Sequence, residues 1–220
     1  MKTKWYNNFS EWRIGQVERV FQLQRNDGLP DLKLWLEPRT EIEPFTDQRL
    51  NALRLELQRF VSAWNEYELF GRFIGPLLSL ISFWGRTYNL FHNRALSLRL
   101  ADDRKTSGQL DGMVAAGFEE PEQPYFFIHE YKRNLNAEGD PQGQLLIAML
   151  AAQHLNSDGG PLYGCYILGP YWRFVYLDGT TFAESQGYDA TDAGELQIIW
   201  NILHETKRRI EARVALLDES

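Results

Sequence analysis

The chain has 220 residues, of which 44% are hydrophobic, and a formal net charge of −7. This length and apolar content suit one well-filled core, so a single domain with elaborations is favoured over two full domains. The single cysteine, Cys165, excludes an intramolecular disulfide and fits a reducing cytosol. The acidic balance argues against broad non-specific affinity for nucleic acid, although it leaves room for a local basic groove.

Two features of the sequence bear on membranes and export. The N-terminal residues contain no apolar segment followed by a small-residue cleavage site, which a signal peptide would require. The most apolar stretch, residues 73–84, is too short to span a bilayer and contains Gly75 and Pro76. We therefore expect a soluble cytoplasmic protein with no membrane contact.

The first part of the chain has mainly helical patterns. Ser10 is a candidate N-cap of a helix whose apolar residues recur every three or four positions. Residues 31–38 alternate in a way that suits an edge strand as well as a helical turn, and both interpretations stay open. Thr46 is a candidate cap for an amphipathic helix that runs to about residue 65.

The period changes in the middle of the chain. Apolar positions continue past residue 65, and Pro76 must kink this run or start a new helix. Residues 95–100 and 109–116 alternate as strands joined by a polar turn. A third strand, rich in aromatic residues, is predicted at 125–132.

The last third of the chain contains two further helices and two further strands. A helix rich in Ala, Leu and Met is predicted at 144–155, followed by strands at 163–168 and 172–177. After an irregular stretch, a long amphipathic helix spans 195–217. This order of elements predicts an α/β fold in which helices flank a central mixed β-sheet.

The strand at 125–132 ends in an acid and a base. Glu130 and Lys132 point to the same side because residues two apart in a strand share a face. Asp111 interrupts the apolar strand before it, and its carboxylate can converge with Glu130 if the two strands pair. Two close carboxylates raise each other's pKa unless a cation lies between them. Oxygen ligands favour Mg²⁺ or Mn²⁺, and the carbonyl of Tyr131 is a further candidate ligand.

Asp111, eighteen intervening residues and then Glu130-Tyr131-Lys132 resemble the D…E-x-K core of the PD-(D/E)xK nuclease superfamily. The order helix, three strands, helix, strand is similar to the common core of that superfamily. The chain departs from the family name at Leu110, where the name has a proline that many members also lack. The resemblance covers residues 66–177. It implies a restriction-endonuclease-like domain over 65–220, with 1–64 as a mainly helical extension packed on it.

The same resemblance implies further site residues. In many members the first core helix directs a glutamate toward the metal. Glu66 is the candidate here and Glu68 the alternative, because both cannot face inward from one helix. The helix after the E-x-K strand often presents a glutamine to the site, with Gln144 as the candidate and Gln142 as the substitute.

The resemblance implies a metal-dependent nuclease that acts on DNA, with RNA left open. Asp111, Glu130 and Glu66 would hold Mg²⁺ or Mn²⁺, and Lys132 would serve the attacking water. Cutting both strands of a duplex requires two sites, which favours a homodimer. Two alternatives stay open: a catalytically inactive protein of the same fold that binds nucleic acid, and a protein-interaction domain in which Glu130 and Lys132 form only an ion pair.

Overall fold

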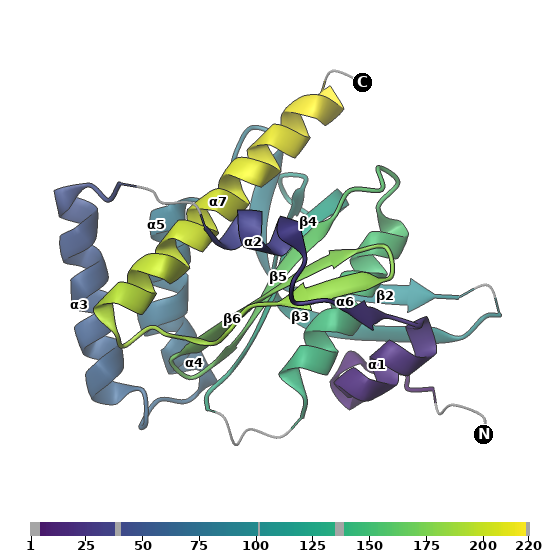
Figure 1. The fold of residues 1–220 in the computed structure, drawn as a ribbon, viewed down its shortest axis with the longest axis horizontal. Helices are drawn as coiled ribbons and strands as arrows, with labels where there is room; N and C mark the ends of the chain where they lie inside the picture. The colour runs from purple at the N-terminus through teal and green to yellow at the C-terminus, as the bar shows by residue number, and fades with distance from the viewer. Residues whose placement is uncertain (1–4, 38–40, 101, 135–138, 219–220) are drawn as a thin grey trace.

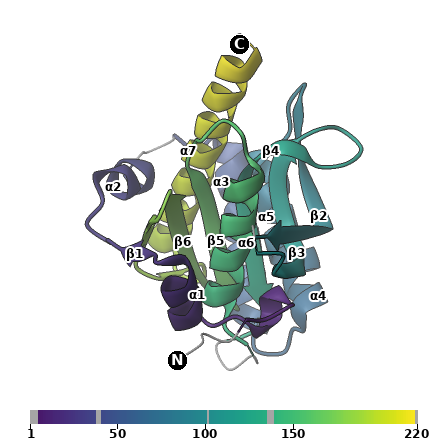
Figure 2. The same ribbon diagram turned by 90° about the vertical axis from the view of Figure 1, so that its right-hand side faces the viewer.

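The structure, a computed structural model, describes residues 5–37, 41–100, 102–134 and 139–218. These residues form three layers, with a β-sheet between two layers of helices (Figure 1). Figure 2 shows α1 (Ile14–Phe21) and α6 (Pro141–Leu155) on one face of the sheet and α3 (Pro44–Phe60), α5 (Gly75–Ile81) and α7 (Ala193–Asp218) behind it. The predicted α/β class with a central mixed sheet is confirmed.

The sheet has eight strands in the order β1-β7-β6-β5-β4-β3-β2, with β8 paired to β6. The pairs β1–β7 and β4–β5 are parallel, and the other pairs are antiparallel. A parallel pair needs a crossover connection, and α6 supplies it between β4 and β5. The strands are β1 (Gln24–Arg25), β2 (Tyr88–Arg99), β3 (Lys105–Ala116), β4 (Glu122–Lys132), β5 (Leu162–Leu168), β6 (Tyr171–Asp178), β7 (Thr181–Glu184) and β8 (Tyr188–Asp189).

The first helix begins later than the sequence pattern predicts. Asn8 caps a short 3-10 turn at Phe9–Glu11, where its side chain accepts a hydrogen bond from the amide of Ser10. Ser10 therefore lies inside that turn and is not the cap of α1, which begins at Ile14. This turn brings the chain up to the N-terminus of α1 from the direction of β3.

Proline residues lie in the first turn of four other helices, α2, α3, α5 and α6. The open choice at residues 31–37 is settled as a helix, α2 (Pro30–Leu36), while residue 38 lies outside the described residues. Pro44 lies in the first turn of α3, so that helix starts before the predicted cap, Thr46. Pro76 lies in the first turn of α5, which follows α4 (Glu66–Leu69) and a π-helical segment at Phe70–Ile74 without a break, so the helical run continues through the proline.

The stretch after β6 contains two strands that the sequence pattern does not reveal. β7 pairs with β6 on one side and with β1 on the other, and β8 pairs with β6. Both are too short to show a clear alternation of apolar and polar residues. The C-terminal helix α7 has 26 residues. Within the described residues, no helix is both long and apolar enough to cross a membrane.

A hydrophobic cluster fills the space on each face of the sheet. The cluster on the α7 side includes Trp35 and Trp64, and the cluster on the α6 side includes Trp12. The residues of the predicted extension share these clusters with the rest of the chain. The indole of Trp35, for example, donates a hydrogen bond to the hydroxyl of Thr206 in α7. The domain boundary between residues 64 and 65 stays a prediction.

Candidate active site

The sheet forks beside Asp111. β3 and β4 are paired from Gly112 and His129 onward, whereas the preceding part of β3 pairs with β2 and, at Ser107, with Asn8 of the N-terminal segment. The N-terminal segment lies against that part of β3, where the indole of Trp12 donates to the hydroxyl of Thr106. We call the place where β3 and β4 separate, between Asp111 and Tyr131, the fork.

The Asp111 side chain fills part of the gap between the strands. Its Oδ2 accepts a hydrogen bond of 2.8 Å from the backbone amide of Tyr131 in β4. This amide would otherwise lack a ladder partner at the fork. In β2, Asn93 adopts a left-handed conformation with φ of 54°. Such backbone strain in a residue other than glycine is often found at functional sites.

Glu130 is the most perturbed acid of the candidate site. Only 3% of the residue is exposed. Burial raises its pKa well above the usual carboxyl range, and the negative charges of Asp111 and Glu66 raise it further, while Lys132 opposes the shift. Its interaction with the nearby Asp111 side chain also raises this pKa. Two carboxyl groups that lie close together favour a shared proton or a cation between them, so the pair can hold a metal ion in place of that proton.

The structure separates the two glutamates of α4 (Glu66–Leu69). Glu68 is exposed, and its carboxylate accepts a hydrogen bond from the amide of Asn65, the N-cap of this short helix. Glu66 instead lines a cavity of about 360 Å³ together with Asp111 and Tyr131. Glu66 is therefore the α4 glutamate that the structure brings to the fork.

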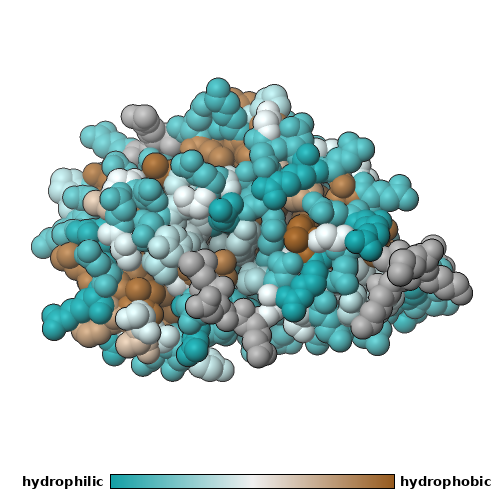
Figure 3. Space-filling model, turned by 60° about the horizontal axis from the view of Figure 1, so that its bottom comes forward, coloured by the Kyte–Doolittle hydropathy of each residue, from teal (hydrophilic) through white to brown (hydrophobic). Residues whose placement is uncertain are grey.

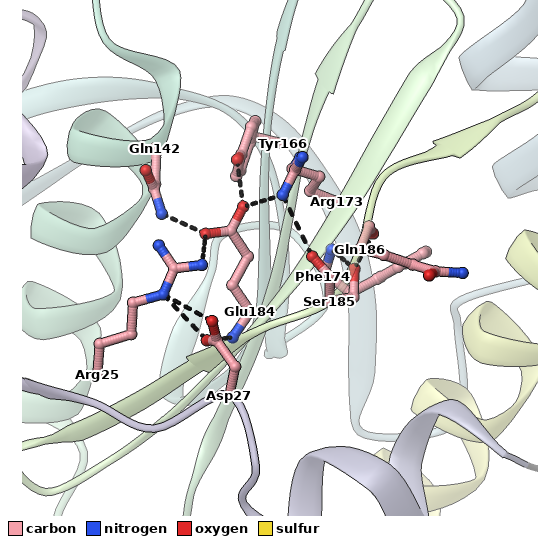
Figure 4. Close-up of polar contacts among 9 residues, drawn as sticks. All are labelled: Arg25, Asp27, Gln142, Tyr166, Arg173, Phe174, Glu184, Ser185 and Gln186. Carbon is pink, nitrogen blue, oxygen red and sulfur yellow. Dashed lines mark hydrogen bonds and ion pairs between the residues drawn. The ribbon is translucent and has the colours of Figure 1, made fainter.

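The two glutamines at the start of α6 also differ. Gln142 donates a hydrogen bond to the carboxylate of Glu184 (Figure 4). Gln144 lines a second cavity, of about 530 Å³, together with Lys132. Only 9% of Gln144 is exposed, and its side-chain amide has no hydrogen-bond partner among the described residues. Gln144 is thus the glutamine that faces Lys132.

Glu184 is a buried carboxylate that the sequence analysis did not single out. It accepts hydrogen bonds from the hydroxyl of Tyr166 and the guanidinium of Arg173, and it forms an ion pair with Arg25 (Figure 4). Tyr166 lies opposite Glu130 in the sheet register. Glu184 therefore anchors the strand beside the candidate site, while its arginines neutralise its charge.

His129 lies at the fork, where its ring packs over Gly112. It is fully buried, and both ring nitrogens lack a hydrogen-bond partner within the described part of the chain. Burial lowers its pKa to about 3, so the ring is neutral. It lies over Gly112, where an added Cβ would come within 1.9 Å of Nε2. This is the placement of a packed strand residue.

The oxygen donors at the fork fit a divalent cation. Asp111 and Glu130 offer carboxylates from adjacent strands, with the Tyr131 carbonyl and Glu66 nearby. In the described residues, no three His, Cys, Asp or Glu side chains are grouped tightly enough to hold a metal ion. Mg²⁺ is commonly bound by only one or two carboxylates and completes its shell with water and substrate phosphate. The donor set is compatible with that mode.

The site occupies a mainly hydrophilic end of the molecule. The C-terminus of β4 and the N-terminus of α6 lie at the bottom of Figure 1, the side that comes forward in Figure 3. Apolar side chains gather on this face at the left, toward α3 and α4 (Figure 3). A charged, hydrated ligand can therefore reach this end of the sheet.

No family model matches the chain, and no curated protein matches it. Its relation to the PD-(D/E)xK superfamily stays a prediction from the motif and the order of elements.

Proposed function

We propose that the protein is a metal-dependent nuclease of PD-(D/E)xK type that hydrolyses phosphodiester bonds of DNA in the cytoplasm. The observation that carries this proposal is that Glu130 is buried near Asp111 at the fork, where burial and the charge of Asp111 raise its pKa and the charge of Lys132 opposes the shift. A buried acid pair of this kind costs free energy unless it binds a proton or a cation.

The residues of the fork have separate tasks in the proposed reaction. Asp111 and Glu130 hold Mg²⁺ or Mn²⁺, and Glu66 contributes from the cavity side. When bound, the ion polarises a phosphate oxygen and lowers the pKa of a water molecule. Lys132 orients that water and stabilises the negative charge that develops on the phosphate oxygens. Gln144 positions the lysine or the phosphate from the opposite wall of their shared cavity.

A catalytically inactive protein of the same fold is the second candidate. The raised pKa of Glu130 beside Asp111 favours it, because a proton held between the two carboxyl groups can satisfy the pair without a metal. Such a protein would bind nucleic acid or another protein through this end of the sheet. It would cut no substrate at any metal concentration.

Cleavage of labelled DNA in Mg²⁺ or Mn²⁺ tests the proposal. We expect the wild-type protein to cut and Lys132→Ala and Asp111→Asn to lose at least about 100-fold in rate, because each removes a group that acts on the transition state. Glu68→Gln is the matched control, since it removes an exposed carboxylate of α4 outside the fork. Wild-type protein that cuts no DNA or RNA, or a Lys132→Ala variant that cuts at the wild-type rate, would contradict the proposal.

A further inference from the structure

The cavity shared by Lys132 and Gln144 has a second positive wall that comes from the N-terminal segment. Ser10 and Arg13 line it together with Gly139, and no acidic residue is among its described lining residues. Arg13 is exposed, and in the described part of the chain no carboxylate pairs with its guanidinium. Two cationic side chains from distant parts of the sequence therefore face one open space of about 530 Å³.

Two helix N-termini meet at the same place. The side chain of Asp140, the N-cap of α6, accepts hydrogen bonds from the amide of Gly143 in α6 and from the amide of Ile14 in α1. Gly143 allows this approach, since an added Cβ would lie 2.7 Å from the backbone oxygen of Trp12. Helix N-termini carry partial positive charge and favour anions. The carboxylate of Asp140 is therefore an anion that both helix N-termini already bind.

Gln144 gives independent evidence that the cavity takes a polar ligand. Gln144 is 9% exposed, and its side-chain amide has no hydrogen-bond partner among the described residues. The amide opens onto the cavity, where a ligand or a water molecule can serve as its hydrogen-bond partner. Arg13 and Lys132 offer only hydrogen-bond donors, and the Gln144 amide offers donors and one acceptor, its oxygen. Donors of this kind match the acceptor oxygens of a phosphate.

We propose that the Arg13 wall of this cavity binds the phosphate of the substrate strand next to the one that is cut, with Arg13 as its binding residue, while Lys132 and Gln144 face the phosphate that is cut. The inference rests on the proposed nuclease function for the identity of the strand, but the binding itself needs no metal. Arg13 matches phosphate through its planar, bidentate guanidinium, and Ser10 adds a hydroxyl donor. The N-terminal segment thereby becomes part of the substrate site.

Binding of a short 5′-labelled single-stranded DNA, measured by fluorescence anisotropy in EDTA, tests the subsite. Arg13→Ala is expected to weaken binding about 10-fold and to reduce the slope of log Kd against log salt concentration by about 1, because one phosphate contact is lost. Arg19→Ala is the matched control, since it removes the same charge from the last turn of the same helix. Arg13→Lys should restore part of the affinity.

Competition by inorganic phosphate gives a second readout. We expect phosphate to displace the DNA from wild-type protein more readily than from Arg13→Ala. Equal affinities of Arg13→Ala and Arg19→Ala, or no DNA binding by the wild type, would overturn the subsite. If these variants bind equally while the wild type still cuts DNA with Mg²⁺, the subsite is wrong and the nuclease function stands. If Arg13→Ala alone loses affinity and the wild type cuts nothing, the subsite stands and the nuclease function is wrong.

Discussion

Single residues decide how the fork is built. Asp111 can satisfy the amide of Tyr131 because the two strands have separated there. Glu130 is buried on the face it shares with Ile128, which packs in the cluster on the α6 side. The sequence predicted the approach of Asp111 and Glu130 on the condition that their strands pair, and β3 and β4 do pair. The choice between Gln142 and Gln144 was not predictable from spacing, since it depends on Glu184, a residue about 40 positions later whose contact exists only in the folded sheet.

Gly112 gives a prediction at the same scale. Gly112→Ala is expected to destabilise the protein by about 2 kcal/mol, because the new methyl group would overlap the buried ring of His129. Gly15→Ala is the control, since a Cβ there meets nothing within 4 Å and alanine favours the helix. Urea unfolding measures both. A Gly112→Ala variant as stable as the wild type would contradict the packing of His129 over this glycine.

At the scale of elements, long periodic segments were predictable and short ones were not. The strand at β4 and the helix at α6 show clear patterns because many successive residues contribute to them. β1 and β8 have two residues each and β7 has four, so their positions are set by pairing with β6 and with one another. The late start of α1 follows from the Asn8 cap, which competes with Ser10 for the same turn.

Glu184 contacts several of these elements, so the variant Glu184→Gln tests how far it holds them together. Its side chain is 2% exposed and contacts β1, β5, β6 and α6 through Arg25, Tyr166, Arg173 and Gln142 (Figure 4). Glu184→Gln is expected to lower the free energy of unfolding by about 2 kcal/mol, because two arginines lose their buried counter-charge while remaining partly hydrated.

The matched control for this variant is Glu56→Gln. Glu56 pairs with Arg72 at the surface, where the glutamate side chain is 37% exposed, so its loss should cost less than about 1 kcal/mol. Urea unfolding of both variants gives the comparison. Equal losses in the two variants would show that the Glu184 cluster does not hold these elements together.

At the scale of the whole molecule, the net charge of −7 means that the proposed recognition of nucleic acid must be local. The described structure offers one such place at the end of β4, where Lys132 and Arg13 line a cavity next to the acid pair. The sequence does not reveal the role of Arg13, because no local pattern connects it to Lys132, more than 100 positions away. Its role follows only from the packing of α1 against α6.

Calorimetric titration with Mn²⁺ tests most directly whether the acid pair at the fork is a metal site. We predict that wild-type protein and Glu68→Gln bind Mn²⁺ and that Asp111→Asn binds it at least about 10-fold more weakly, because one of the two carboxylates in the site has lost its charge. Circular dichroism should show that all three proteins are folded. Wild-type protein that binds no Mn²⁺, or Asp111→Asn that binds it as tightly as the wild type, would contradict the account.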